Sequence, residues 1–553
     1  MANFIFVTGG VISGLGKGIT TSSVSLLLEQ SGYTVTALKA DPYLNMDAGT
    51  MNPIIHGETF VTEDGLETDQ DLGHYERFLN KNLSKLNYMT SGMVFQSVID
   101  NERKMAYQGE CVEMIRHVPE EISRRLILLA NTSKADVVVA EIGGTVGDIQ
   151  NILFLEAARQ LRLMSTHTVL VIHVAYLPFP KNLGELKTKP AQQSVSHLLA
   201  AGIQPDFIVT RSEREIDSLR KEKIAIFCNV HKEDIFTNPD LPSVYQVPAY
   251  LKKQGIVERI IEKMHLPRKT ADKTKEKNWD TFVEKTKSKT KGPLIGIVGK
   301  YIKSGDYSLE DSYICVLESL KQAFYYHDLL PRVEWVASDE IEQDGTEVLK
   351  KYDGLIVPQG WGSRGTEGKI AAIQFARENN VPYLGLCFGM QMAVIEFARH
   401  VLGMKDANST EVTESTPFPV IHIMPGQAEY LRKKQYGGTI RLGAWPAVLQ
   451  KGTKLLEIYK KYSNVNYPIN DRDSDPVVQE RHRHRYEFNE AYLDKFREHG
   501  LTASALSPDG KLVEAIELAD HPFFIGVQYH PELKSRPLAP HPIFLAFLEA
   551  TIK

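Results

Sequence analysis

Cys387 has the sequence surroundings of a nucleophile. Residues 383 to 391 read YLGLCFGMQ, so an apolar run ends with glycines two positions before and two positions after the cysteine. Glycines at these positions permit the sharp turn from a strand into a helix that projects a nucleophile above a sheet. The N-terminal end of the following helix, expected from Met390 to His400, favours the reactive thiolate. The spacing therefore predicts nucleophilic catalysis by Cys387.

A cysteine nucleophile needs a base that takes its proton and returns it. Residues 526 to 532 read GVQYHPE and follow another expected strand, so His530 can act as the base while Glu532 fixes its orientation. Taken singly, Cys387 would more often be a core cysteine and His530 a loop histidine. The turn motif together with the paired His530 and Glu532 favours a Cys–His–Glu triad.

The oxyanion formed by such a nucleophile must be stabilised by fixed N–H donors. Residues 357 to 362 read VPQGWG after an expected strand, and Gly360 in this turn is one candidate donor. The amide of Phe388 is the other. A plain connection between a strand and a helix is the alternative for so short a motif.

A second motif of chemical interest lies at the N-terminus. Residues 8 to 20 read TGGVISGLGKGIT, between an expected strand and an expected helix. Such a turn exposes backbone N–H groups and a positive helix end that bind phosphates, and Lys17 adds a mobile cation. Gly10 and Gly16 enclose five residues instead of four, and Gly18 replaces the usual Ser or Thr, so the motif is a variant P-loop. A structural turn without a ligand is the alternative.

Three further charged residues are expected near this loop. Lys39 closes the next strand, at the carboxyl edge where ligands of open α/β sheets bind. Asp71 lies in TDQDLGHYER and Glu141 lies in AEIGGTVGDI at a strand end. Because Mg²⁺ prefers carboxylates combined with nucleotide phosphates, Asp71 and Glu141 are the predicted metal ligands. For each of the three, a packed or solvated surface side chain is the alternative reading.

The elements that must position these residues repeat one order: a β-branched run, a glycine-rich turn and a helical pattern. This order predicts an α/β protein with two domains, each with a mainly parallel sheet flanked by helices. The lysine-rich residues 267–292 are expected to be a solvated linker between domains at 1–266 and 293–553, with a basic surface helix as the alternative. The expected strands are residues 4–8, 34–39, 137–141, 168–173, 207–210, 294–299, 354–358, 382–386 and 524–528.

The composition restricts the class of protein. The chain has 553 residues, of which 42% are hydrophobic and 24% are charged, as in globular proteins with sizeable cores. The formal net charge of -5 argues against nucleic acid as a partner. Four scattered cysteines suit a reducing cytoplasm, the N-terminus does not read as a secretion signal, and no apolar run is long enough for a membrane span.

The triad strings resemble those of class I glutamine amidotransferases. Four other strings resemble the CTP synthetases: TGGVISGLGKGIT, LKADPYLNMDAGTMNP at 38–53, EIGGTVGDI and KTKPAQ at 187–192. The resemblance covers nearly all of the chain outside the linker. It implies a P-loop-like synthetase domain at 1–266, a class I glutaminase domain at 293–553, and ATP-dependent amination of UTP to CTP with ammonia from glutamine.

The same resemblance implies roles for individual residues of this chain. ATP would be bound by Gly14, Leu15, Gly16, Lys17, Gly18, Ile19, Lys39 and Asp71, with Mg²⁺ on Asp71 and Glu141. UTP, and the inhibitory product CTP, would be bound by Ser13, Asp148, Ile149, Gln150, Lys187, Thr188, Lys189, Pro190, Ala191, Gln192 and Lys223. Glutamine would be bound by Gly360, Phe388, Gly389, Met390, Gln391, Glu411 and Arg485. A homotetramer and activation by GTP are also implied.

The chain departs from the usual pattern of this family at several positions. Residues 358 to 362 read PQGWG where PGGFG is usual, and Gln150 stands where an acid is usual. Gly14 and Ala191 stand where Ser and Thr are common. The absence of a carboxylate at Gln150 is expected to alter the strength of CTP inhibition. Trp361 is expected to alter the segment that covers the glutamine site.

Two other functions fit part of these motifs. One is a different ATP-dependent amidotransferase, such as a cobyrinic-acid-amidating synthetase, but the two lysines of KTKPAQ suit a second nucleotide. The other is a partitioning-type ATPase joined to an inactive glutaminase fold. The joint presence of Cys387, His530 and Glu532 argues against that reading.

Overall fold

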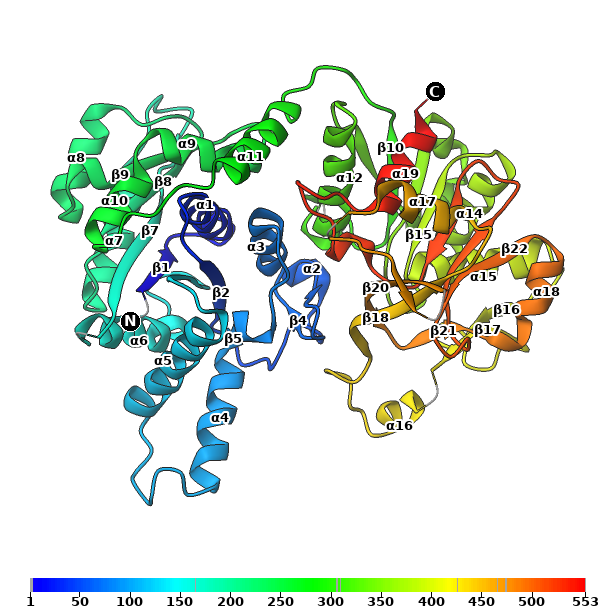
Figure 1. The fold of residues 1–553 in the computed structure, drawn as a ribbon, viewed down its shortest axis with the longest axis horizontal. Helices are drawn as coiled ribbons and strands as arrows, with labels where there is room; N and C mark the ends of the chain where they lie inside the picture. The colour runs from blue at the N-terminus through cyan, green and yellow to red at the C-terminus, as the bar shows by residue number, and fades with distance from the viewer. Residues whose placement is uncertain are drawn as a thin grey trace. The chain divides into compact units, whose positions relative to one another are not determined.

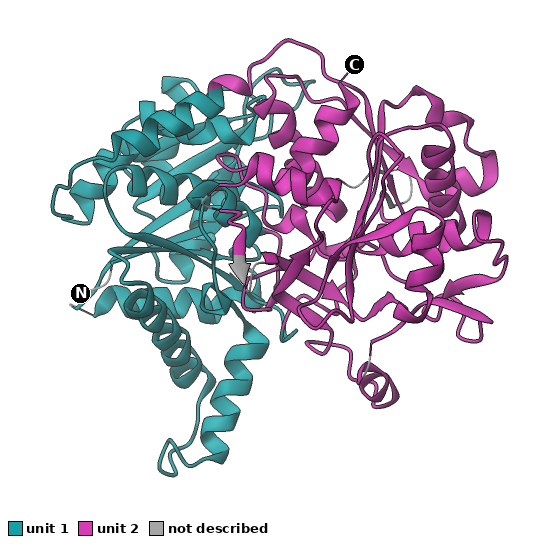
Figure 2. Ribbon diagram, turned by 45° about the vertical axis from the view of Figure 1, so that its right-hand side comes forward, with its two compact units in different colours: residues 1–46, 71–283 teal, residues 47–70, 284–553 magenta. Residues whose placement is uncertain are grey.

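The computed structural model describes residues 3–164, 166–304, 307–308, 310–424, 426–464, 466–472 and 475–552. Many of its helices and strands are labelled in Figure 1. The chain forms two compact units, coloured separately in Figure 2. Unit 1 contains residues 1–46 and 71–283, and unit 2 contains residues 47–70 and 284–553. We call residues 47–70 the inserted segment, because the chain leaves unit 1 for unit 2 there and then returns. No helix in the described part of the chain is long and apolar enough to cross a membrane.

Unit 1 is built on a parallel sheet, as its β-branched runs predicted. Its described residues form seven strands in the order β5-β2-β6-β1-β7-β8-β9. Parallel strands are buried on both faces and therefore read as continuous apolar runs. The strands are β1 (Asn3–Gly9), β2 (Val35–Asp41), β5 (Tyr88–Thr90), β6 (Val137–Ile142), β7 (Thr168–Tyr176), β8 (Phe207–Ser212) and β9 (Ile235–Pro239).

Helices cover both faces of this sheet, and alternate residues of β1 contact different layers. Phe4 and Phe6 belong to a core that includes α5 and α6, whereas Ile5 and Val7 belong to a core that includes α1, α9 and α10. The helices are α1 (Lys17–Gln30), α3 (Asp71–Leu79), α4 (Ser91–Arg103), α5 (Met114–Ser133), α6 (Ile152–Leu163), α7 (Lys189–Ala200), α8 (Ser218–Cys228), α9 (Val247–Lys253), α10 (Ile256–Lys263) and α11 (Lys273–Lys285). Short 3-10 helices are η1 (Lys85–Asn87), η2 (Ile149–Asn151), η3 (Lys232–Asp234) and η4 (Val244–Gln246).

Helix α11 lies within residues 267–292, for which a solvated linker was predicted. Trp279, Phe282 and Val283 are buried, and the Trp279 indole donates to the Tyr245 carbonyl at 3.3 Å. These three residues stand at i, i+3 and i+4, the spacing of an apolar helix face. The many lysines of this stretch concealed that face, and this part of the chain packs on unit 1.

Unit 2 is built on a mixed sheet. Its described residues form ten strands in the order β13-β10-β14-β15-β24-β23-β22-β18-β20-β19, and the first five are parallel. The α/β class is as predicted, but the antiparallel half was not foreseen. The strands are β10 (Ile295–Gly299), β13 (Val333–Ala337), β14 (Gly354–Val357), β15 (Tyr383–Leu386), β18 (Arg441–Leu449), β19 (Asn470–Arg472), β20 (Asp475–His484), β22 (Leu501–Leu506), β23 (Val513–Leu518) and β24 (Phe524–Val527).

Two helical layers enclose this sheet. One core joins it to α14 and α15, and the other joins it to α12, α17 and α19. The α-helices are α2 (Pro53–His56), α12 (Ile314–Tyr326), α13 (Ser338–Asp344), α14 (Thr366–Glu378), α15 (Phe388–His400), α16 (Gln427–Arg432), α17 (Lys454–Tyr462), α18 (Leu493–Glu498) and α19 (Pro542–Thr551). Small sheets are formed by β3 (Phe60–Val61) with β4 (Glu67–Thr68), by β11 (Lys303–Ser304) with β12 (Tyr307–Ser308), and by β16 (Ala407–Ser409), β17 (Phe418–Ile423) and β21 (Tyr486–Phe488). The 3-10 helices are η5 (Asp311–Tyr313), η6 (Glu347–Lys351), η7 (Glu490–Tyr492) and η8 (Pro531–Leu533).

The inserted segment is fixed to unit 2 by two arginines of β20. Arg481 is completely buried and donates to the Glu63 carboxylate at 2.9 Å and to the Val61 carbonyl at 3.0 Å. Arg483 donates to the Glu67 carboxylate at 2.8 Å. Charged hydrogen bonds of this kind hold a loop more firmly than neutral ones.

Candidate active sites

The strand, turn and helix expected around Cys387 are present in unit 2. β15 ends at Leu386, Cys387 has φ 50° and ψ -101°, and α15 begins at Phe388. A side chain on Gly389 would place its Cβ 1.9 Å from the Val357 carbonyl oxygen. Only glycine therefore fits at this position, and the tight packing of α15 on β14 forces the turn that carries the thiol.

His530 and Glu532 follow β24, the strand beside β15. The Nδ1 atom of His530 and the Glu532 carboxylate form a hydrogen bond of 2.7 Å, and both side chains are buried. The other ring nitrogen, Nε2, has no hydrogen-bond partner among the described residues. Burial disfavours the charged ring, but the Glu532 carboxylate and Cys387 outweigh it and raise the pKa of His530 to about 10. The site thus favours an imidazolium beside the thiol.

The glycine turn at residues 358–362 lines the same pocket as the thiol, and buried side chains hold it at both ends. The Lys369 ammonium donates to the Pro358 carbonyl at 2.7 Å, and the Lys300 ammonium donates to the Gly362 carbonyl at 2.8 Å. Burial lowers the pKa of Lys369 well below its ordinary value and lowers that of Lys300 to about 8. The Gly362 amide donates to Glu411 at 2.8 Å. The turn is therefore rigid, as oxyanion donors require.

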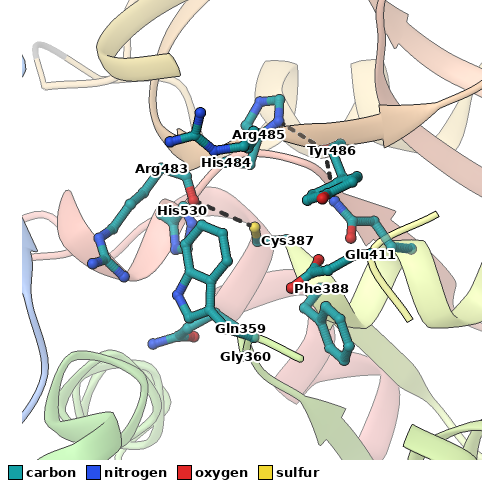
Figure 3. Close-up of a pocket in the computed structure, with 12 residues that line it drawn as sticks. Gln359, Gly360, Cys387, Phe388, Glu411, Arg483, His484, Arg485, Tyr486 and His530 are labelled. Atoms are coloured by element: carbon teal, nitrogen blue, oxygen red, sulfur yellow. Dashed lines mark hydrogen bonds between the residues drawn. The ribbon is translucent and has the colours of Figure 1, made fainter. Parts of the chain in front are cut away.

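One pocket collects most of the residues expected to bind glutamine (Figure 3). Cys387 and His530 line it together with Gly360, Phe388, Gln391, Glu411 and Arg485. Gly389 and Met390 are buried in the first turn of α15 and are not lining residues. The Arg485 guanidinium donates to Gln427 and to Thr439, each at 2.8 Å.

Sequence reasoning missed several residues at this pocket. Gln528 donates to the Cys387 sulfur at 3.5 Å and accepts from Gln391 at 3.2 Å. Gln528 lies inside the string GVQYHPE that predicted the triad, so its position beside His530 could have indicated a residue near the thiol. Lys369, in contrast, stands in a helix with no motif around it. Gln528 and Lys369 lie behind the lining residues. The lining residues without a predicted role are Gln359, Arg483, His484 and Tyr486, and Trp361, expected at the cover of the site, also lines the pocket.

The phosphate-loop candidates lie in unit 1, between β1 and α1. Gly16 precedes α1 with φ 92°, in the left-handed region that favours glycine. Lys17 begins the helix, is buried, and donates to the Gly144 carbonyl at 3.0 Å. Burial lowers the pKa of this lysine. A side chain at Gly18 would put its Cβ 2.2 Å from the Asp71 carboxylate, so glycine there lets α1 and α3 approach closely.

Asp71 and Glu141 converge on one cationic group. The Lys39 ammonium bonds to the Asp71 carboxylate and lies 3.2 Å from Glu141, whose other oxygen accepts from Tyr75. Burial raises the pKa of Asp71, but Lys39 outweighs it and the pKa falls to about 2. Burial and then repulsion by Asp71 raise the pKa of Glu141 to about 7.

This pair of carboxylates fits Mg²⁺. Both are hard oxygen donors, and the Lys39 ammonium demonstrates that their oxygens can face one positive charge. No cluster of three or more His, Cys, Asp or Glu side chains suited to a metal exists within the described ranges. Two carboxylates alone do not fill the coordination shell of Mg²⁺, so a bound ion would need further oxygen ligands.

The residues expected to bind UTP follow four neighbouring strands of unit 1. Ser13 follows β1, residues 148–150 follow β6, and residues 187–192 follow β7. Because the carboxyl ends of parallel strands share one sheet edge, these segments lie on the same side of the sheet. The Gln192 amide donates to the Thr188 hydroxyl at 3.1 Å, and Lys187 pairs with Glu185. Lys223 is exposed on α8, which follows β8.

Comparison with known proteins decides the family. Residues 3–266 match the family model "CTP synthase N-terminus", and residues 308–550 match "Glutamine amidotransferase class-I". A CTP synthase of Caldanaerobacter subterraneus subsp. tengcongensis is 50% identical over 100% of this chain and 98% of its own length.

The chain belongs to the CTP synthase family.

A second relative agrees with this assignment to the CTP synthases. A CTP synthase of Bacillus subtilis is 45% identical over 100% of this chain and 99% of its own length. Among solved structures, the glutaminase domain of Trypanosoma brucei CTPS with bound acivicin is 35% identical over 47% of this chain and 93% of that chain, with a TM-score of 0.40. The CTP synthase N-terminus match runs through the inserted segment, although that segment folds with unit 2.

Proposed function

We propose that this protein makes CTP by releasing ammonia from glutamine at Cys387 and transferring it to UTP that ATP has activated. The observation that carries the proposal is the pairing, in one chain of this family, of the Cys387–His530–Glu532 arrangement with a lysine-bearing phosphate loop. A glutaminase alone would not need the loop, and an ATPase alone would not need the thiol.

Glutamine hydrolysis follows from the residues of the pocket. The Cys387 thiolate attacks the carboxamide carbon, and the amides of Gly360 and Phe388 stabilise the oxyanion. His530 gives its proton to the departing ammonia, and a thioester remains on the cysteine. Water then attacks the thioester, with His530 as the base, and glutamate is released. The Arg485 guanidinium and the Glu411 carboxylate suit the carboxylate and ammonium of the substrate.

Activation of UTP uses the residues of unit 1. ATP transfers its γ-phosphoryl group to the 4-oxygen of uracil, which turns a poor leaving oxygen into a good one. Ammonia adds at C4, phosphate leaves, and CTP and ADP are the products. The phosphate loop from Gly14 to Ile19, with Lys17 and Lys39, would hold the phosphates of ATP. Asp71 and Glu141 would hold Mg²⁺, which supplies charge neutralisation of the phosphates when bound.

The remaining assignments belong to the same proposal and are supported by the family. Residues 13, 148–150, 187–192 and 223 would bind UTP and the inhibitor CTP, with cations facing the triphosphate. GTP would activate, and four copies would form a homotetramer. The four cysteines form no disulfide in the part of the chain that the structure describes, which would suit a reducing cytoplasm. The synthetase chemistry would belong to the domain predicted at 1–266 and the glutaminase chemistry to the domain predicted at 293–553.

The test is incubation of the purified protein with UTP, ATP, MgCl₂ and glutamine, with CTP measured by chromatography. A second arm replaces glutamine by ammonium chloride, and a third omits UTP. We expect CTP in the first two arms and no net phosphate release in the third. Absence of CTP in both of the first two arms would contradict the proposal, and phosphate release without UTP would indicate another acceptor.

A further inference from the structure

Glu58, in the inserted segment, is a buried carboxylate within unit 2. It is 4% exposed, and its backbone amide donates to the Asp311 carbonyl at 2.9 Å. One carboxylate oxygen accepts from the Cys315 amide at 2.6 Å, near the start of α12. The other accepts from the side-chain amide of Gln359 at 2.5 Å. A carboxylate from the first hundred residues of the chain is thus bonded to the glycine turn that lines the pocket of Cys387.

Gln359 precedes Gly360, the proposed oxyanion donor, by one position. Its side-chain oxygen has no hydrogen-bond partner among the described residues, so the bond to Glu58 decides how the amide group points. Its backbone carbonyl accepts from Lys369 at 3.4 Å. Rotation of the Gln359–Gly360 peptide would move the Gly360 N–H, so a bond at Gln359 acts directly on the donor's direction.

We propose that Glu58 is a positioning residue for glutamine hydrolysis, which holds the Gly360 amide in place through the side chain of Gln359. This inference rests on the proposed function, because it assigns Gly360 to the oxyanion site. A glycine in place of Gln359 would have no side chain to donate to the Glu58 carboxylate.

The charge environment of Glu58 gives the link a pH dependence. Burial, and then repulsion by the Glu532 carboxylate, raise the pKa of Glu58 to about 7, against the bonds from Cys315 and Gln359. The Tyr313 phenol also faces it, and its pKa lies well above neutrality. When Glu58 takes up a proton, one of its two oxygens becomes a donor. The carboxyl group can then no longer accept from both the Cys315 amide and the Gln359 amide. Glutaminase activity should therefore gain a component that rises with pH around neutrality.

The experiment is a double-mutant cycle on the full chain with Glu58→Gln and Gln359→Met. We expect each single variant to lower kcat for glutamine hydrolysis roughly tenfold to a hundredfold, with KM nearly unchanged, because oxyanion donors act in the transition state. The kcat of the double variant should be no lower than that of the more impaired single variant, since both substitutions break the same hydrogen bond. Glu58→Gln should also abolish the rise of kcat with pH around neutrality. CTP formation from ammonium chloride should stay within twofold of the wild type.

Asp64→Asn is the matched control, because it removes an exposed carboxylate from the same segment and should leave all rates unchanged. Unchanged kcat in Glu58→Gln, or full additivity in the double variant, would overturn the inference. Loss of the ammonium-dependent activity as well would point to general unfolding and would also count against it. Glutamate release is measured separately from CTP formation. A protein that hydrolyses glutamine without making CTP would contradict the proposed function, and the double-mutant cycle on glutamate release would still test this inference.

Discussion

The backbone of Cys387 has a positive φ because the contacts on either side of it fix the course of the chain. Gly389 packs against the Val357 carbonyl, and the Cys387 amide donates to the Val527 carbonyl at 2.7 Å. Strain of this kind persists where the surrounding structure determines the backbone, and it clusters at catalytic residues. The string GLCFG predicted this turn, because both flanking glycines are visible in the sequence.

Replacing the nucleophile should separate the two activities. Cys387→Ala is expected to abolish CTP formation from glutamine and to keep CTP formation from ammonium chloride, because in the proposed mechanism the thiol serves only ammonia release. The measurement is the initial rate of CTP formation with each nitrogen source. Lys17→Ala is the opposite case and should stop both. Loss of both activities in Cys387→Ala would contradict the division into two sites.

The stability of unit 1 should fall in mild acid because of His173. This ring is completely buried between the Thr8 and Ser194 hydroxyls, and burial, followed by the charge of Lys17, lowers its pKa to about 3. In the unfolded chain His173 binds a proton near pH 6.5, whereas in the folded chain it stays neutral until about pH 3. Its contribution to stability is therefore complete above pH 6.5 and is lost as the pH falls toward 3. The expected slope is about 1 kcal/mol per pH unit. Urea denaturation between pH 7 and pH 5 measures it, and His173→Asn should flatten it; an equal slope in the variant would refute the assignment.

At the level of elements, much of the fold was visible in the sequence. The nine strands expected from β-branched runs are all present, with ends that differ by a few residues, because such runs mark strands buried on both faces. The antiparallel strands β18, β20, β22 and β23 were missed, since charged residues such as Arg481 interrupt their alternation. Lys369 was missed because a lysine in a helix is normally exposed, and only tertiary packing buries this one.

The close approach of α1 and α3 can be tested at Gly18. In Gly18→Ala the new Cβ would collide with the Asp71 carboxylate, which Lys39 holds in place. We expect CTP formation from ammonium chloride to fall roughly tenfold or more, because the collision would displace the residues proposed to bind phosphate and metal. Glutamate release measured without nucleotides should not change. Ser22→Ala, which removes a hydroxyl from the same helix, is the control, and an equal loss in that variant would show a general effect on α1.

At the level of the whole molecule, the inserted segment is the feature that sequence reasoning could not find. Residues 47–70 lie in a continuous family match, and nothing in their composition indicates that they fold with unit 2. The contacts that hold them depend on partners more than four hundred positions away, such as Glu63 with Arg481. Long-range pairings of this kind follow from three-dimensional packing and leave no local pattern.

Removal of Arg481 should detach this segment. Arg481→Met leaves Glu63 without its cation and the Val61 and Leu533 carbonyls without their donor. We expect a loss of about 2 to 4 kcal/mol in the free energy of unfolding, because buried polar groups lose their partners. The midpoint of urea denaturation measures this loss. Arg497→Met, at an exposed ion pair on α18, should have almost no effect, and equal midpoints for the two variants would contradict the argument.

The insertion also sets an order of events during synthesis. Residues 47–70 leave the ribosome roughly 20 to 80 seconds before Arg481 does, given about 400 intervening residues and translation at about 5 to 20 residues per second. During that interval their flanks, β2 and α3, can already join the sheet of unit 1. The nascent chain must therefore carry a tethered, unpaired loop, and the glutaminase pocket closes only after the last strands have been translated.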